Sequence, residues 1–469
     1  MIDILFNKEN FHELPELDLN TVNNLNLKSL VRELSINDRE SQYVVNVLCK
    51  LQQSNNDIVA RQMAIQDFLD NGGLLGTLKK ALEDVDSIAG ERQTIKRIAL
   101  NSGTRIESDQ RKKTRSTFGN IMNISNVLLR CIGIYIHLGG VLAQYEFQSE
   151  YLQRLQSFFV NFKKSYEFSQ FEEHIRRLSD IEVGNSNISM SVELLKEIGK
   201  MTVSFHEINE EDKKKSKGIR SSLEQELLEN LTGVATQNLC DYLHIVVATM
   251  EKQLDYLRDQ LRFYNFALGY VATLQRENLE LFYPEIAEDY EETSVLNMYS
   301  IYLLAKHVKD IVPNDVKANR VTVLLGGNNT GKTCYVIGVA LMQIFGQAGL
   351  PLPSLEESKI CPVSDILSQF AAGEKDLGRF EEEVRELETI LGKIDNKTLV
   401  IFNETFQSTV YEEIAQPFKD ILDTMVEAGA HALVVTHNEP FISLCKDSGD
   451  VKLLKMNGGH EIEEVIYPI

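Results

Sequence analysis

The sequence has 469 residues, which is too long for one ordinary domain and long enough for two or three. Hydrophobic residues make up 43% and charged residues 25%, values typical of a soluble globular protein. The formal charge of −21 argues against a protein that coats nucleic acid over its whole surface. A basic inner surface that contacts phosphates locally stays compatible with this charge.

The cysteine spacing and the apolar segments indicate the cellular compartment of the protein. The six cysteines are scattered and form no CxxC pair, so we expect neither a zinc site nor a disulfide framework, and a cytoplasmic protein. The start, MIDILFNKEN, lacks the pattern of a signal peptide. The apolar run from Val127 to Ala143 contains Arg130 and His137, which favours a buried helix over a membrane span.

Residues 15–290 are predicted to be mainly helical. Asp57–Leu82 has apolar residues at helical spacing on both sides of Asn71-Gly72-Gly73, which predicts a helix, a glycine stop and a second helix. Leu223–Leu281 has helical spacing and no proline, which predicts one very long helix or two helices end to end. Such a helix needs a neighbour along its length, so we expect a lever or a coiled-coil pair.

The zone of about 160–222 is less regular and is predicted to be an insertion with exposed loops. It contains an acidic group followed by a basic cluster. This cluster either contacts DNA phosphates at the tip of a clamp or is a solvated loop balanced by the acids before it. Its members are Lys213, Lys214, Lys215, Lys217 and Arg220.

From residue 291 the pattern changes to short β-rich runs that alternate with helices. VTVLL begins at 321, TLVIF at 398 and HALVVT at 431, which indicates a parallel sheet with covering helices. The predicted fold class is therefore α plus α/β. A helical region, 1–290, with its insertion at about 160–222, precedes an α/β domain, 291–469.

The strongest motif follows the first of these strands and fits G-x-x-x-x-G-K-[ST] without exception. Glycines let backbone N–H groups point at phosphate oxygens, and the following helix adds partial positive charge. Lys332 is predicted to neutralise the β- and γ-phosphates of ATP, and the Thr333 hydroxyl to bind Mg²⁺. The predicted nucleotide contacts are Gly326, Gly327, Asn328, Asn329, Thr330, Gly331, Lys332, Thr333, Cys334 and Asn314.

Two further strand ends complete the predicted site. TLVIF ends in Asn403-Glu404, the Walker B form with Asn in place of the usual Asp. Thr333 and Asn403 are therefore predicted to hold Mg²⁺ weakly, and Glu404 to orient the attacking water. HALVVT ends at His437, which either senses the γ-phosphate or is a strand-end histidine with its hydrogen bonds satisfied; its place after two nucleotide motifs favours the first. Lys332, Glu404 and His437 are the predicted catalytic residues.

These residues resemble the MutS-type mismatch-repair ATPases. Val312-Pro313-Asn314-Asp315 and VTVLLGGNNTGKTCY are similar to the VPND and GPNxGGKST segments of that family. Thr436-His437 matches its TH switch, and Gly378-Arg379-Phe380 with Glu383 matches its signature segment in part. Arg61–Leu82 and Leu254–Ile286 resemble its core and lever helices, so the resemblance covers most of residues 15–469.

The resemblance implies that residues 291–469 form a P-loop ATPase domain of the ABC type. It also implies a homodimer whose two ATPase domains sandwich nucleotide, each signature segment reaching the partner's γ-phosphate, while lever arms enclose DNA. Three departures modify this expectation. Gly378 replaces the signature serine, and we expect Arg379 to supply positive charge in trans. Ile311 stands where the family stacks an aromatic on adenine. The chain is also too short for the family's mismatch-reading domain, so recognition of mismatches stays an open question.

Two functions stay open. The first is an ATP-binding, slowly hydrolysing ATPase that dimerises and binds DNA as a nucleotide-switched clamp, with Asn403 slowing hydrolysis. The second is an ATP-gated protein-interaction module with little or no DNA binding, which the acidic charge favours. A P-loop kinase would leave the helical half and the Thr436-His437 pair unexplained.

Overall fold

The structure is a computed structural model that describes residues 3–5, 14–35, 40–104, 110–164, 171–176, 188–195, 200–207, 222–354, 358–371, 379–407, 409–446 and 448–465. It forms two compact units. The helical unit comprises Gly76–Glu146 and Arg154–Arg258. The sheet unit comprises Asp3–Leu75, Phe147–Gln153 and Asp259–Ile469.

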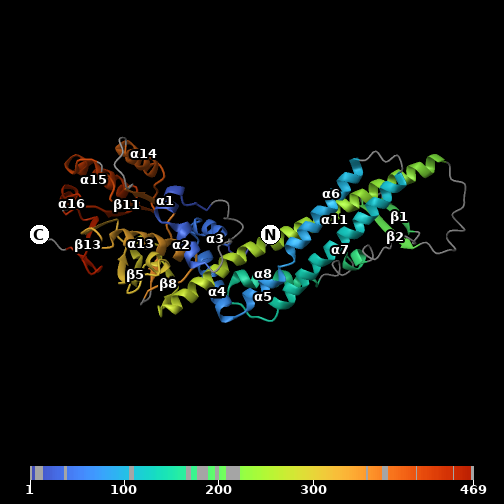
Figure 1. The fold of residues 1–469 in the computed structure, drawn as a ribbon, viewed down its shortest axis with the longest axis horizontal. Coiled ribbons are helices and arrows are strands. Elements are labelled where there is room, and N and C mark those ends of the chain that lie inside the picture. The colour runs from blue at the N-terminus through green and yellow to red at the C-terminus, as the bar shows by residue number, and fades with distance from the viewer. Residues whose placement is uncertain are drawn as a thin grey trace. The chain divides into compact units, whose positions relative to one another are not determined.

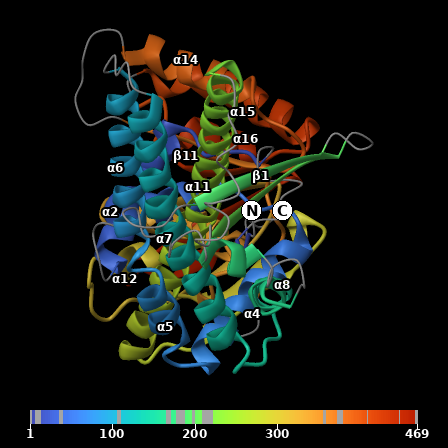
Figure 2. The same ribbon diagram turned by 90° about the vertical axis from the view of Figure 1, so that its right-hand side faces the viewer.

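Three helices of the helical unit run side by side (Figures 1 and 2). They are α6 (Val85–Thr104), α7 (Gln110–Leu142) and the first part of α11 (Ser222–Arg276). Buried aliphatic side chains such as Ile88, Ile124 and Val247 fill the space between them. Arg92 on α6 pairs with Glu251 on α11 at 2.6 Å, at the edge of this apolar core. The unit also contains α5 (Leu74–Ala81), most of α8 (Glu150–Phe162) and the antiparallel hairpin of β1 (Ile188–Leu195) and β2 (Lys200–Glu207).

The apolar part of α7 is a packed helix of this unit. Among the described residues, Gly119–Leu142 is the segment long and apolar enough to cross a membrane, and 61% of its apolar window is buried within the structure. Gly139 permits close packing on α8, because a Cβ there would lie 2.6 Å from the Phe159 carbonyl oxygen. Burial of this kind is usual for the core helix of a helical bundle.

The main sheet of the sheet unit has six strands in the order β10-β11-β12-β7-β13-β14. All neighbouring pairs are parallel except β13 and β14. Every residue of the central strands β11 and β12 is buried, as expected for a parallel sheet covered on both faces. The strands are β7 (Val321–Gly326), β10 (Asp365–Phe370), β11 (Thr398–Asn403), β12 (His431–Val435), β13 (Val451–Met456) and β14 (Ile462–Glu464).

Helices cover the main sheet on both faces (Figure 1). The helices α14 (Arg379–Leu391), α15 (Tyr411–Glu427) and α16 (Glu439–Cys445) share one apolar core with alternate residues of β7, β11 and β12. The opposite face packs against α13 (Lys332–Gln347), which follows β7 directly. Because β7 feeds α13, the connecting loop lies at the carboxyl edge of the sheet, where ligands of α/β folds bind.

Smaller elements complete the sheet unit. A four-stranded sheet runs in the order β4-β9-β5-β6, and β3 pairs with β8. The strands are β3 (Leu281–Phe282), β4 (Glu285–Ile286), β5 (Ser294–Met298), β6 (Asn314–Lys317), β8 (Leu352–Pro353) and β9 (Lys359–Ile360). The remaining helices are α1 (Leu19–Asn24), α2 (Leu27–Leu34), α3 (Ser41–Leu48), α4 (Asn55–Asp70), η1 (Tyr290–Glu292) and α12 (Ile301–Ala305).

The helical predictions agree with these elements. The predicted break after Asp70 separates α4 from α5, and the predicted long helix is the single 55-residue helix α11. The combination of helices with a parallel sheet confirms the broad fold class. All six cysteines are free, five of them buried.

The two units do not follow the predicted boundary at residue 290. Residues 3–75 and 259–290 belong to the sheet unit, and buried hydrogen bonds hold them there. Gln347 of α13 donates to the Gln52 carbonyl at 2.9 Å, and Tyr270 of α11 donates to the Pro351 carbonyl at 3.1 Å. Gln62 of α4 donates to the Pro284 carbonyl at 3.0 Å, which joins the two segments to each other. Within the predicted insertion at 160–222, residues 188–207 contain a β-hairpin in place of the expected loops. The cluster from Lys213 to Arg220 lies outside the described residues.

Candidate functional site

The glycine-rich loop joins β7 to α13 through left-handed backbone conformations. Gly326 has φ 150°, Asn329 has φ 60° and Gly331 has φ 102°. A Cβ at Gly326 would lie 2.7 Å from the Met456 carbonyl oxygen of the neighbouring strand. Glycine meets both demands because it has no Cβ and adopts positive φ without strain. The loop therefore has the curled backbone that phosphate binding needs.

Lys332, the first residue of α13, is buried beneath this loop. Its Nζ donates to the carbonyl oxygens of Gly326 at 3.0 Å and Gly327 at 2.8 Å. Burial lowers the pKa of the Lys332 ammonium, and the charge of Glu404 acts in the opposite direction. A cation held by loop carbonyls at a helix N-terminus fits a polyanionic ligand such as a nucleotide triphosphate.

Thr333 and Asn403 bring the loop and the end of β11 together. The Thr333 hydroxyl donates to Oδ1 of Asn403 at 3.3 Å. Both groups are neutral oxygen ligands of the kind Mg²⁺ accepts. The described residues contain no group of three or more His, Cys, Asp or Glu side chains that would hold a metal. The pair fits a Mg²⁺ that takes its other ligands from phosphates and water.

Glu404 and His437 lie at the ends of neighbouring strands. Glu404 follows β11 with φ 58°, and its N–H donates to the Val435 carbonyl of β12 at 2.8 Å. One carboxylate oxygen lies 3.4 Å from Nε2 of His437, and the other accepts from Gln407 Nε2. The His437 Nε2 makes no hydrogen bond to any described residue, so this approach is an electrostatic contact. The geometry does not fit a strand-end histidine with satisfied hydrogen bonds.

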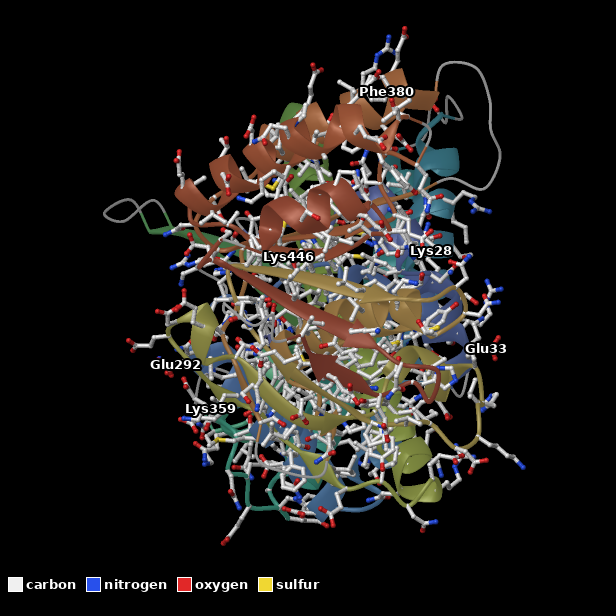
Figure 3. The ribbon with its side chains drawn as sticks, turned by 90° about the vertical axis from the view of Figure 1, so that its left-hand side faces the viewer. Lys28, Glu33, Glu292, Lys359, Phe380 and Lys446 are labelled. Carbon is white, nitrogen blue, oxygen red and sulfur yellow. The ribbon has the colours of Figure 1, made fainter. Side chains whose placement is uncertain are left out.

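The loop after Glu404 contacts the start of α14. Phe406 has φ 63° and is buried, and its ring lies 5.6 Å from that of Phe418 and 6.0 Å from that of Phe380. Phe380 is 42% exposed, at the beginning of α14 (Figure 3). Of the other predicted signature residues, Gly378 lies outside the described residues, and only the backbone of Arg379 is described.

The remaining predicted nucleotide contacts fall into two groups, those in the glycine-rich loop and after it, and Asn314. Asn328 and Asn329 are exposed at the loop tip, and Cys334 is partly exposed, with its thiol pKa raised by burial. Asn314 uses its side chain on the β13–β14 turn: Nδ2 donates to the His460 carbonyl at 3.0 Å, and Oδ1 accepts from Ile462 N at 2.9 Å. Asn314 therefore supports the β13–β14 turn, which lies beside the glycine-rich loop.

His460 is a residue of this site that the sequence did not indicate. It lies in the turn between β13 and β14, and its Nδ1 lies 2.7 Å from the Thr330 carbonyl oxygen of the glycine-rich loop. A single histidine in a short turn, 130 positions from its contact, carries no motif. Only the pairing of β13 with β7 brings the two together.

The parallel sheet, with the glycine-rich loop between β7 and α13, defines an α/β domain. Residues 322–468 match the family described as MutS domain V. This match covers 147 of the 469 residues, so the likeness to the MutS family concerns this domain.

Curated relatives also match part of the chain. They include the protein named Endonuclease MutS2 of Enterococcus faecalis, 32% identical over 132 residues, and that of Ligilactobacillus salivarius, 33% identical over 136 residues. These matches cover 27% and 28% of this chain and 17% of each relative. The protein of the same name in Agathobacter rectalis is 27% identical over 168 residues, which cover 34% of this chain and 21% of that protein.

Proposed function

We propose that the sheet unit binds MgATP and hydrolyses it slowly, and that the nucleotide controls a MutS-type dimer that binds DNA. The observation that carries ATP binding is the buried Lys332 ammonium beneath the glycine-rich loop, beside Thr333 and Asn403. The match of residues 322–468 to MutS domain V supports the link to DNA.

Each side chain has one role in this proposal. Loop N–H groups and Lys332 bind the phosphates, and Thr333 with Asn403 holds Mg²⁺, which would neutralise charge on the phosphates. Glu404 orients the attacking water, and His437, 3.4 Å from it, responds to the γ-phosphate. Asn403 provides an amide oxygen where a carboxylate would attract the metal more strongly, which accounts for slow hydrolysis.

Nuclease activity is not part of this proposal. The relatives are named Endonuclease MutS2, but the match covers only 17% of the length of each. The formal charge of −21 favours the second candidate, an ATP-gated module that engages a protein partner.

ATP binding is tested first, by equilibrium binding of a fluorescent ATP analogue. We expect saturable, Mg²⁺-dependent binding that is lost in Lys332→Ala and retained in Lys397→Ala, which removes an exposed lysine before β11. Equal binding by the wild type and Lys332→Ala would refute the assigned site.

DNA binding is tested by fluorescence anisotropy with duplex, mismatched and branched DNA, with and without ATP, over a salt series. Binding that needs ATP and weakens as salt rises would support the clamp, since phosphate contacts release counterions. No binding at low salt, in protein that binds ATP, would reject DNA binding and leave the protein-interaction module as the function.

A further inference from the structure

We propose that His460 is a positioning residue that holds the glycine-rich loop in its phosphate-binding conformation. The inference rests on the proposed ATP site and extends it to the β13–β14 turn. Nδ1 of His460 lies 2.7 Å from the Thr330 carbonyl oxygen, and since a carbonyl only accepts, Nδ1–H is the donor.

The turn that carries His460 is rigidly built by Asn457. The Asn457 side-chain oxygen accepts from the N–H groups of Gly459 at 2.9 Å and Glu461 at 3.1 Å. Its backbone closes the turn, because Asn457 N donates to the Glu461 carbonyl and His460 N to the Asn457 carbonyl. His460 itself has φ 68°, a left-handed conformation. These hydrogen bonds fix the conformation of the turn and therefore the position of the His460 imidazole.

A second strand anchors the same turn. Asn314, at the start of β6, donates to the His460 carbonyl at 3.0 Å and accepts from Ile462 N at 2.9 Å. The turn is thus held from β6 on one side and contacts the loop on the other. Gly331 lies next to the ring, since a Cβ built on it would be in van der Waals contact with the His460 Nδ1, at 3.4 Å.

Because the peptide bond is planar, the contact at the Thr330 carbonyl also sets the direction of the Gly331 N–H. The Thr330 carbonyl and the Gly331 N–H belong to one planar trans peptide, so they point in opposite directions. When His460 holds the carbonyl, it fixes the plane and aims the Gly331 N–H away from the turn. Phosphate binding by backbone N–H groups depends on such orientations, and Gly331, with φ 102°, is otherwise free to change them.

Two substitutions separate the hydrogen bond from the backbone conformation. His460→Gly keeps the left-handed backbone and removes the donor. His460→Asn keeps both, because the Asn amide nitrogen, like Nδ1, is bonded to Cγ, and Asn tolerates positive φ. His307→Gly is the matched control, since His307 is exposed and also has a positive φ, 54°.

We expect His460→Gly to weaken ATP binding about tenfold, the net effect of one lost hydrogen bond, and to raise KM with little change in kcat. His460→Asn should restore affinity to within about twofold of the wild type. Unchanged affinity in His460→Gly, or equal loss in both variants, would overturn the proposal.

Hydrogen exchange in nucleotide-free protein gives a second readout that does not depend on ATP. We expect faster exchange of the amides of residues 326–333 in His460→Gly, with unchanged exchange over Tyr411–Glu427 of α15. Identical exchange in the loop would refute the contact even if the protein bound no ATP. A wild type that binds no ATP would refute the proposed function alone.

Discussion

Two loops at the carboxyl edge of one sheet differ in how well they follow the expected pattern. The loop at 326–333 matches its motif without exception, and glycine occupies two of its three left-handed positions. The loop at 403–407 begins with Asn in place of Asp, and its left-handed positions are Glu404 with φ 58° and Phe406 with φ 63°. A bulky side chain in this conformation costs roughly 1–3 kcal/mol.

The difference separates two functions. In the proposed function the first loop would hold the phosphates and supply Thr333 to the metal, whereas the second would supply Asn403 to the metal and Glu404 to orient water. Phe406 offsets part of the strain by packing between Phe418 and Phe380, which ties the second loop to the start of α14. We infer that the residues proposed to bind nucleotide follow the MutS pattern closely. The residues proposed for hydrolysis are where this chain departs from that pattern.

Replacing the proposed base should produce the largest effect on hydrolysis. Glu404→Gln keeps the shape of the side chain but removes the charge beside His437, so single-turnover hydrolysis should fall about 100-fold or more while ATP affinity stays the same. Glu427→Gln, on the exposed last turn of α15, is the control. Hydrolysis unchanged by Glu404→Gln would exclude this residue as the base.

Restoring the expected acid should have the opposite and smaller effect. Asn403→Asp places a carboxylate 3.3 Å from the Thr333 hydroxyl, so Mg²⁺ should bind more tightly and turnover should rise roughly tenfold. The measurement is steady-state ATP hydrolysis over a Mg²⁺ titration. If both the Mg²⁺ dependence and the turnover were unaltered, Asn403 would not be the cause of slow hydrolysis.

The comparison of the two loops also shows what the sequence could predict. The glycine-rich loop is contiguous, so its residues, the strand before it and the helix after it follow from one pattern. The approach of Glu404 to His437 follows from parallel strands, whose ends meet at one edge of a sheet. Local periodicity likewise predicted α11 and the break between α4 and α5.

Contacts between distant segments could not be predicted in this way. The sequence indicates Asn314 as a nucleotide contact, and it did not indicate that the amide also donates to the carbonyl of His460, a partner 146 positions away. The packing of residues 3–75 with the sheet depends on buried amides such as Gln347, whose partners no periodicity identifies. The left-handed Phe406 was equally unforeseen, since its conformation depends on the rings around it.

The smallest predicted effect concerns Arg379, where α14 begins. If this charge acts in trans on the partner's nucleotide, Arg379→Ala should lower steady-state turnover about twofold to fivefold, since charges at an exposed helix start are screened by solvent. The effect should shrink as salt rises and should vanish in protein too dilute to dimerise. Turnover unchanged by Arg379→Ala at low salt, in protein shown to be dimeric, would reject a role in trans. Slow hydrolysis would then depend on the loop at 403–407 alone.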